Sequence, residues 1–122
     1  MGKTVLLIED EPNIIEAISF ILSRDGWTVD THSNGHDAVE VVMGRRPDVL
    51  ILDVMLPGKS GYEILSELRG SLSPKDLPVL MLTARGQSKD RELAERSGVN
   101  RFMTKPFANA EVLEAVRSLV VA

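Results

Sequence analysis

Three nearly uninterrupted apolar segments, each followed directly by a polar residue, constrain this chain more than any other feature of its sequence. Such segments are typical of strands buried on both faces, as in the middle of a parallel sheet. They are Leu6–Ile8 before Glu9 and Asp10, Val49–Leu52 before Asp53, and Val79–Leu82 before Thr83. A shorter, half-polar segment, Arg101–Thr104, leads into Lys105. The sequence therefore predicts a parallel sheet with polar residues gathered at the carboxyl ends of its strands.

Amphipathic segments alternate with these strands, which predicts repeated strand-then-helix units. The segment Trp27–Thr31 alternates polar and apolar residues and Arg101–Thr104 is short, so both are expected at the edges of the sheet. Right-handed crossovers then favour a doubly wound α/β fold with a five-stranded parallel sheet in the order 2-1-3-4-5. We expect one domain over residues 1–122, with strands at Thr4–Glu9, Trp27–Thr31, Asp48–Asp53, Pro78–Thr83 and Arg101–Thr104.

The predicted helices carry recognisable end signals. The second helix is expected to open after Ser33–Gly35, and Ser60 with Glu63 forms a capping box at the start of the third. Asn109 is expected to be the N-cap of the last helix. The segment Ser88–Ser97 carries six charged residues beside a thin apolar stripe, so we expect a weakly packed helix that can move.

Composition limits the classes of function. The 122 residues carry a net charge of −4, which argues against direct binding of nucleic acid, because such binding needs a basic surface. The sequence contains no cysteine, and no apolar stretch approaches the roughly 18 residues of a membrane span. Its first residues lack the apolar core of a signal peptide. We therefore expect a cytoplasmic protein that binds neither nucleic acid nor membranes.

Three acidic residues are predicted to share one crevice. Glu9, Asp10 and Asp53 should lie where the chain reverses direction between the first and third strands, which is the usual ligand site of such sheets. Carboxylates held this close repel one another, and a hard divalent cation relieves that repulsion. Mg²⁺ suits a site of few carboxylates that also holds a phosphate oxygen, and Mn²⁺ could take its place. The alternative is that Glu9, Asp10 and Glu11 form a solvated acidic loop.

Three further side chains predict what the crevice does. The carboxylate of Asp53 can attack a phosphoryl group and form an acyl phosphate. The hydroxyl of Thr83 can donate a hydrogen bond to one phosphoryl oxygen, and Lys105 can pair with another as a point charge. Because phosphoryl transfer depends mostly on positioning and charge neutralisation, these residues predict a phosphoryl-transfer site.

Four motifs in this order resemble the receiver domain of bacterial two-component response regulators, over essentially the whole chain. They are Val5–Pro12, Asp53–Gly61, Leu82–Ala84 and Phe102–Phe107. The resemblance implies a flavodoxin-like fold and a signalling switch in which Asp53 receives phosphate from a phosphohistidine of a sensor histidine kinase or a histidine phosphotransfer protein. It also implies that the domain catalyses its own phosphorylation from a phosphodonor and its own dephosphorylation, without being a conventional turnover enzyme.

The resemblance further implies roles for individual residues. Asp10, Asp53 and the backbone carbonyl of Met55 would bind Mg²⁺, and Glu9 would complete the acidic pocket and contact the metal through water. Lys105 would contact the phosphoryl group.

A conformational switch is also implied by the resemblance. Thr83 would move toward the phosphoryl group and Phe102 would rotate inward, changing the face around residues 84–107. This face, from the fourth helix through the fifth strand to the fifth helix, would control a downstream protein or an output domain.

Asn100 and Arg101 stand where a large DNA-binding subfamily often has acidic residues that pair across a symmetric dimer. Arg91 and Glu111 could still form one familiar pair of that dimer, so a phosphorylation-dependent homodimer stays open as an alternative.

Two other classes of function remain to be weighed. The first is an interaction module of the same fold that ignores phosphate, against which the intact Asp53, Thr83 and Lys105 argue. The second is an enzyme on a similar sheet. The sequence has no Gly-x-x-x-x-Gly-Lys loop, and a dehalogenase-type phosphatase would need an Asp where Met55 stands. We also hypothesise that Met55 and Arg85, which flank the phosphorylation pocket, slow hydrolysis of the acyl phosphate.

Overall fold

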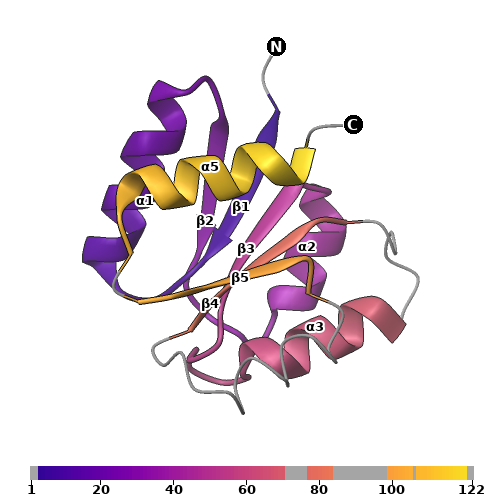
Figure 1. Ribbon diagram of the computed structural model, residues 1–122. Coiled ribbons are helices and arrows are strands. Elements are labelled where there is room, and N and C mark those ends of the chain that lie inside the picture. Colours follow the sequence, from indigo (N-terminus) through magenta and orange to yellow (C-terminus); the bar gives the residue numbers. More distant parts are fainter. Residues whose placement is uncertain (1–2, 71–76, 84–98, 106, 121–122) are drawn as a thin grey trace.

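Five parallel strands form a single sheet in the order 2-1-3-4-5, as predicted (Figure 1). The computed structural model describes residues 3–70, 77–83, 99–105 and 107–120. The strands are β1 (Thr4–Ile8), β2 (Thr28–His32), β3 (Val49–Asp53), β4 (Val79–Thr83) and β5 (Arg101–Thr104). The described helices are α1 (Pro12–Arg24), α2 (Ala38–Arg45), α3 (Gly61–Gly70) and α5 (Asn109–Val120). The helix predicted over Ser88–Ser97 lies outside the described residues.

The sheet is covered by helices on both faces, and each face has its own apolar core. Alternate residues of every central strand point to opposite faces because the side-chain period of a strand is two. One core joins the sheet to α1 and α5, which lie together in Figure 1, and the other joins it to α2 and α3. In β3, for example, Ile51 belongs to the first core, whereas Leu50 and Leu52 belong to the second. This double covering explains why the central strands are apolar throughout.

β2 and β5 are the edge strands, as predicted, and each strand boundary lies within one residue of its predicted position. All five residues of β3 are buried, whereas β2 has no fully buried residue. Glu9, Asp48 and Pro78 fall just outside the strands that were expected to include them. β2 begins at Thr28 because the N–H of Trp27 still donates to the carbonyl of Leu22 at the end of α1, 3.1 Å away.

One predicted helix start is confirmed and another is wrong. In α3 the Glu63 N–H donates to Ser60 Oγ (3.2 Å), and the Ser60 N–H donates to Glu63 Oε1 (3.3 Å), so the capping box is present. In α5 the preceding residue is Ala108 and Asn109 is already helical. The side chain of Glu111 accepts the Ala108 N–H at 2.9 Å, which supplies half of a capping box without a polar residue at the N-cap.

α2 begins at Ala38, several residues after the predicted opening signal. The Gly35 N–H donates to the carbonyl of Pro57 (2.9 Å), so this loop is held against the loop that follows β3. A Cβ at position 35 would lie 2.2 Å from the carbonyl oxygen of Lys59, which explains why glycine is needed there. No helix among the described residues is both long enough and apolar enough to cross a membrane.

Candidate functional site

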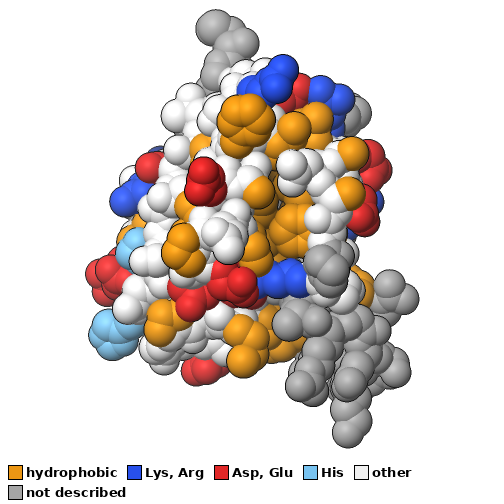
Figure 2. Space-filling model, turned by 90° about the vertical axis from the view of Figure 1, so that its left-hand side faces the viewer, with side chains coloured by type: hydrophobic (Ala, Val, Ile, Leu, Met, Phe, Trp, Pro, Cys, Tyr) orange, Lys and Arg blue, Asp and Glu red, His pale blue; other side chains and the backbone are white. Residues whose placement is uncertain are grey.

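The candidate site lies at the carboxyl ends of β1 and β3, where the chain reverses direction. Ile8 and Leu52 are register partners in these parallel strands, so the next residues, Glu9 and Asp53, lie side by side. Both are buried, with exposed fractions of 0% for Glu9 and 1% for Asp53. Figure 2 shows acidic side chains gathered beside a basic one on the surface of the molecule. The topology thus brings two carboxylates together at the carboxyl end of the sheet, as the sequence predicts.

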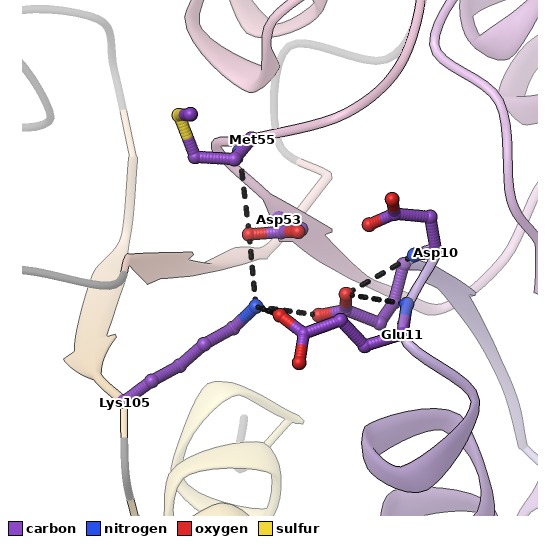
Figure 3. Close-up of polar contacts among 6 residues, drawn as sticks. Asp10, Glu11, Asp53, Met55 and Lys105 are labelled. Atoms are coloured by element: carbon purple, nitrogen blue, oxygen red, sulfur yellow. Dashed lines mark hydrogen bonds and ion pairs between the residues drawn. The ribbon is translucent and has the colours of Figure 1, made fainter.

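Asp10 completes an acidic cluster at this end of the sheet. One carboxylate oxygen from each of Glu9, Asp10 and Asp53 lies within 4.8 Å of the others. Asp10 is the exposed member, and Figure 3 shows its carboxylate directed toward that of Asp53. Asp53 Oδ2 is buried, and no group of the described residues donates a hydrogen bond to it. A buried carboxylate oxygen without a partner is energetically costly unless a cation or a reacting group occupies the space beside it.

Lys105 reaches this cluster from the segment after β5. Its Nζ lies 3.1 Å from Glu9 Oε1, 3.2 Å from Glu11 Oε1 and 3.3 Å from Asp53 Oδ1 (Figure 3). Burial alone would lower the pKa of Lys105, but the hydrogen bond with Glu9 and the negative charge of Asp53 outweigh burial and raise it. Lys105 is therefore held as an ammonium among three carboxylates.

Glu9 has an unusually high pKa because it is buried. Burial is the largest effect and raises the pKa of Glu9 from 4.5 to about 7, against hydrogen bonds that favour the carboxylate. Two of those bonds come from the backbone N–H groups of Asp10 and Glu11, each 3.1 Å from Glu9 Oε2. Near neutral pH, Glu9 is thus close to the point at which it changes between its protonated and ionised forms.

This pKa predicts a stability change with pH. The pKa of Glu9 in the folded state, about 7, lies above the ordinary 4.5, so its contribution is fully present below about 4.5 and is lost as the pH rises through about 7. In EDTA we expect the contribution of Glu9 to the free energy of unfolding to fall by on the order of 2 kcal/mol between about pH 5 and pH 8. Urea titrations of wild type and Glu9→Gln measure this contribution as their difference.

The matched control for this prediction is Glu16→Gln, which changes an exposed glutamate of α1. Glu16→Gln should keep the pH dependence of wild type, whereas Glu9→Gln should flatten it. Equal pH dependence in wild type and Glu9→Gln would show that Glu9 keeps an ordinary pKa.

Met55 contributes its backbone to the site. The Met55 N–H lies 3.3 Å from Asp53 Oδ1 and donates to it, and the Met55 side chain is 70% exposed. The Met55 backbone N–H thus lies beside the Asp53 carboxylate, and the metal-binding role of the Met55 carbonyl stays a prediction. Asp53 Oδ1 is satisfied by this N–H and by Lys105, whereas Oδ2 has no partner within the part of the chain that the structure describes.

Of the two residues predicted to change conformation on phosphorylation, the structure describes the side chain of Phe102 but not that of Thr83. Thr83 is the last residue of β4 and is the register partner of Thr104, but its side chain lies outside what the structure describes, as do Ala84 and Arg85. Phe102 is half-buried on β5 and packs against the core shared with α2 and α3. The phenyl ring thus lies on the strand next to β4.

Two contacts are not predicted from the sequence, one within the site and one at the amino end of β5. Glu11 was predicted only as part of an acidic loop, yet its carboxylate hydrogen-bonds Lys105 across 94 positions of the chain. Arg101 makes a two-pronged contact with Glu114 of α5, at 3.2 and 2.9 Å. No sequence spacing predicts either contact, because each depends on how a strand end meets a helix.

Gly61 fixes the backbone beside Asp53, and this gives a second stability prediction. A Cβ at position 61 would lie 2.5 Å from the carbonyl oxygen of Asp53 and 2.9 Å from Val54 Cα. Because both are backbone atoms, we expect Gly61→Ala to lower the free energy of unfolding by about 2–3 kcal/mol. Gly44→Ala is the matched control, since its Cβ meets nothing within 4 Å in α2 and should stabilise by about 0.5–1 kcal/mol. Urea unfolding of both variants checks the pair, and equal effects would contradict the predicted clash.

Comparison with known proteins identifies the family of this fold. The sequence matches the model of the response regulator receiver domain over residues 5–117. The chain belongs to this family. The receiver domain is 42% identical over 117 residues to the probable transcriptional regulatory protein TcrX of Mycobacterium tuberculosis, which covers 96% of this chain and 49% of the relative. The chain thus spans about half the length of that curated relative.

Solved structures agree with this membership. The chemotaxis response regulator CheY4 of Vibrio cholerae matches with a TM-score of 0.91 and 27% identity, over 98% of this chain and all of the other. The receiver domain of the sensor histidine kinase PA1611 from Pseudomonas aeruginosa matches with a TM-score of 0.88 and 30% identity, over 99% of this chain and 100% of the other. That structure has a magnesium ion coordinated in its active-site cleft.

The acidic cluster of this receiver domain fits a hard divalent cation. Carboxylate oxygens are the ligands that Mg²⁺ prefers, and the three here already lie within 4.8 Å of one another. The buried, unpartnered Asp53 Oδ2 is an oxygen that a cation would satisfy. The chemistry of these donors is therefore consistent with Mg²⁺.

Proposed function

We propose that this receiver domain is a switch that accepts a phosphoryl group on Asp53 in a Mg²⁺-dependent reaction. The observation that carries the proposal is the environment of Asp53 Oδ2 at the carboxyl end of the central strand β3. This oxygen is buried and has no hydrogen-bond partner among the described residues. The neighbouring carboxylates and the ammonium of Lys105 supply the charges that phosphoryl transfer needs.

The proposed donor is a phosphohistidine of a sensor histidine kinase or of a histidine phosphotransfer protein. An oxygen of Asp53 attacks the phosphorus, the P–N bond to the imidazole breaks, and the ring nitrogen keeps the electron pair. Lys105 neutralises negative charge beside the attacking carboxylate, which is already 3.3 Å from its Nζ. In dephosphorylation, water attacks the same phosphorus, the P–O bond to Asp53 breaks, and the carboxylate is restored. The exposed Met55 beside this site, with Arg85, is proposed to slow that attack.

Asp10, Asp53 and the backbone carbonyl of Met55 are the proposed Mg²⁺ ligands, with Glu9 acting through water. When bound, the cation supplies positive charge next to the transferring phosphoryl oxygens. The magnesium in the related Pseudomonas aeruginosa domain supports this assignment, and Mn²⁺ should bind the same oxygen ligands. Burial raises the pKa of Glu9, and a bound cation would lower it again by favouring the ionised carboxylate.

The proposed response is a population shift on the face that contains β5 and α5. Thr83 would bond the phosphoryl group and the Phe102 ring would move inward, so phosphate would favour one of two arrangements of this face. The name of the Mycobacterium tuberculosis relative suggests that the output is control of transcription, through a separate protein or an attached domain in the cytoplasm. A symmetric dimer through this face would have to break or extend the Arg101–Glu114 contact within each chain.

Intact-mass spectrometry of the purified chain with acetyl phosphate tests the proposed function. With Mg²⁺ we expect a gain of one phosphoryl group, and with EDTA we expect none. Mn²⁺ should restore the gain. Absence of any gain with either cation would favour the other candidate, an interaction module of the same fold that acts without phosphate.

A further inference from the structure

Lys105 has three carboxylate partners that differ greatly in exposure. An ammonium has three N–H donors, and oxygens of Glu9, Glu11 and Asp53 already lie within 3.3 Å of Nζ. The Lys105 side chain is 13% exposed, whereas that of Glu11 is 59% exposed. In Figure 3 the carboxylates of Glu11 and Asp53 approach Lys105 from different directions. A phosphoryl oxygen can therefore reach this ammonium only if one of the present partners gives way.

The burial of the three partners decides which one can leave. Glu9 is fully buried, so removing its cation would leave an uncompensated buried carboxylate. Asp53 is the group that would carry the phosphoryl group, so it stays next to Lys105. Glu11 can turn into water at low cost, because its carboxylate is already mostly exposed to solvent. Glu11 is thus the partner whose loss costs least.

The backbone of Glu11 is fixed, so only its side chain has to move. Its N–H donates to Glu9 Oε2 (3.1 Å), and its carbonyl accepts from Ile14 (3.1 Å) and Ile15 (3.0 Å) in the first turn of α1. Glu11 is the N-cap of α1, but its side chain makes no capping hydrogen bond. A carboxylate at a helix N-terminus is favoured by the helix dipole, so the released side chain has a favourable place in solvent.

We propose that Glu11 is a positioning residue that holds Lys105 in the resting state and releases it when a phosphoryl group reaches Asp53. This inference rests on the proposed function. Lys105 exchanges the Glu11 carboxylate for a phosphoryl oxygen, while its contact with Glu9 persists. Glu11 therefore competes with the phosphoryl group for the same ammonium and lowers the fraction of the activated state.

The test is the affinity for beryllofluoride, a phosphoryl mimic, measured by fluorine NMR in saturating Mg²⁺. We expect Glu11→Gln to bind beryllofluoride about two- to fivefold more tightly than wild type, because the competing carboxylate of Glu11 is exposed and its ion pair is therefore weak. Glu16→Gln removes the same charge from an exposed position further along α1 and should bind like wild type.

A double-mutant cycle separates exchange from a general effect of charge. In a Lys105→Met background, Glu11→Gln should leave the affinity unchanged, because there is no ammonium to release. An equal gain in both backgrounds would mean that the charge of Glu11 simply repels the anion, and this would overturn the inference. Equal affinities of wild type and Glu11→Gln would also overturn it while leaving the proposed function intact. Wild type that binds no beryllofluoride at all would overturn both.

Discussion

Asp53→Asn should abolish the Mg²⁺-dependent gain of a phosphoryl group from acetyl phosphate. An amide cannot form the acyl phosphate that a carboxylate forms, so the loss should be complete and not partial. The substitution keeps the size of a residue that is 1% exposed, so the fold should be retained. Intact-mass spectrometry measures the gain, and circular dichroism with urea unfolding checks the fold.

Asp48→Asn is the matched control for this prediction. Asp48 precedes β3 at its other end, where its Oδ2 accepts the Thr4 N–H at 2.7 Å. Its replacement should leave phosphorylation unchanged. A normal gain in Asp53→Asn would mean that another residue accepts the phosphoryl group.

Lys105→Met should lower the free energy of unfolding strongly at alkaline pH when no divalent cation is present. Removal of the ammonium leaves Glu9 and Asp53 as neighbouring buried carboxylates, and breaking a buried pair in this way costs about 3–5 kcal/mol. Because Glu9, with its pKa of about 7, can take up a proton, we expect a loss of about 2–3 kcal/mol at about pH 8 in EDTA. Urea unfolding at about pH 5 should show a smaller loss, since Glu9 is then protonated.

Addition of Mg²⁺ and a control substitution of another lysine test whether this loss of stability comes from the missing positive charge. Saturating Mg²⁺ should recover most of the stability of Lys105→Met, because a divalent cation restores positive charge among the same oxygens. Lys59→Met removes a lysine that pairs with the exposed Glu67 and should change stability by about 0.5 kcal/mol or less. If Lys105→Met were as stable as wild type at about pH 8 without Mg²⁺, the three contacts of Lys105 would not offset the repulsion among the carboxylates.

The sheet could be predicted almost entirely from the sequence, for a physical reason. A strand such as β3 is buried on both faces, so apolar residues fill it from Val49 to Leu52 and the signal is strong. Boundaries depend on single hydrogen bonds, such as that from Trp27 to Leu22, and these leave no pattern in the sequence. The N-cap of α5 was misplaced because the acceptor there is the side chain of Glu111 and not a polar residue at the cap.

The acidic part of the site could also be predicted, whereas the contacts of its lysine could not. Glu9, Asp10 and Asp53 follow parallel strands directly, so the topology alone brings them together. The contact between Glu11 and Lys105 depends on the direction in which α1 leaves the sheet and on the reach of two long side chains. Neither the direction of α1 nor the reach of these side chains produces a periodic pattern in the sequence.

Chemical trapping of the phosphoryl group tests the central claim most directly. After reaction with acetyl phosphate and Mg²⁺, borohydride reduces an aspartyl phosphate to the alcohol, which leaves homoserine in the chain. Peptide sequencing by mass spectrometry then finds the reduced position. We expect homoserine at position 53 and at no other aspartate. A phosphorylated protein without homoserine at that position would contradict the role of Asp53 as the acceptor.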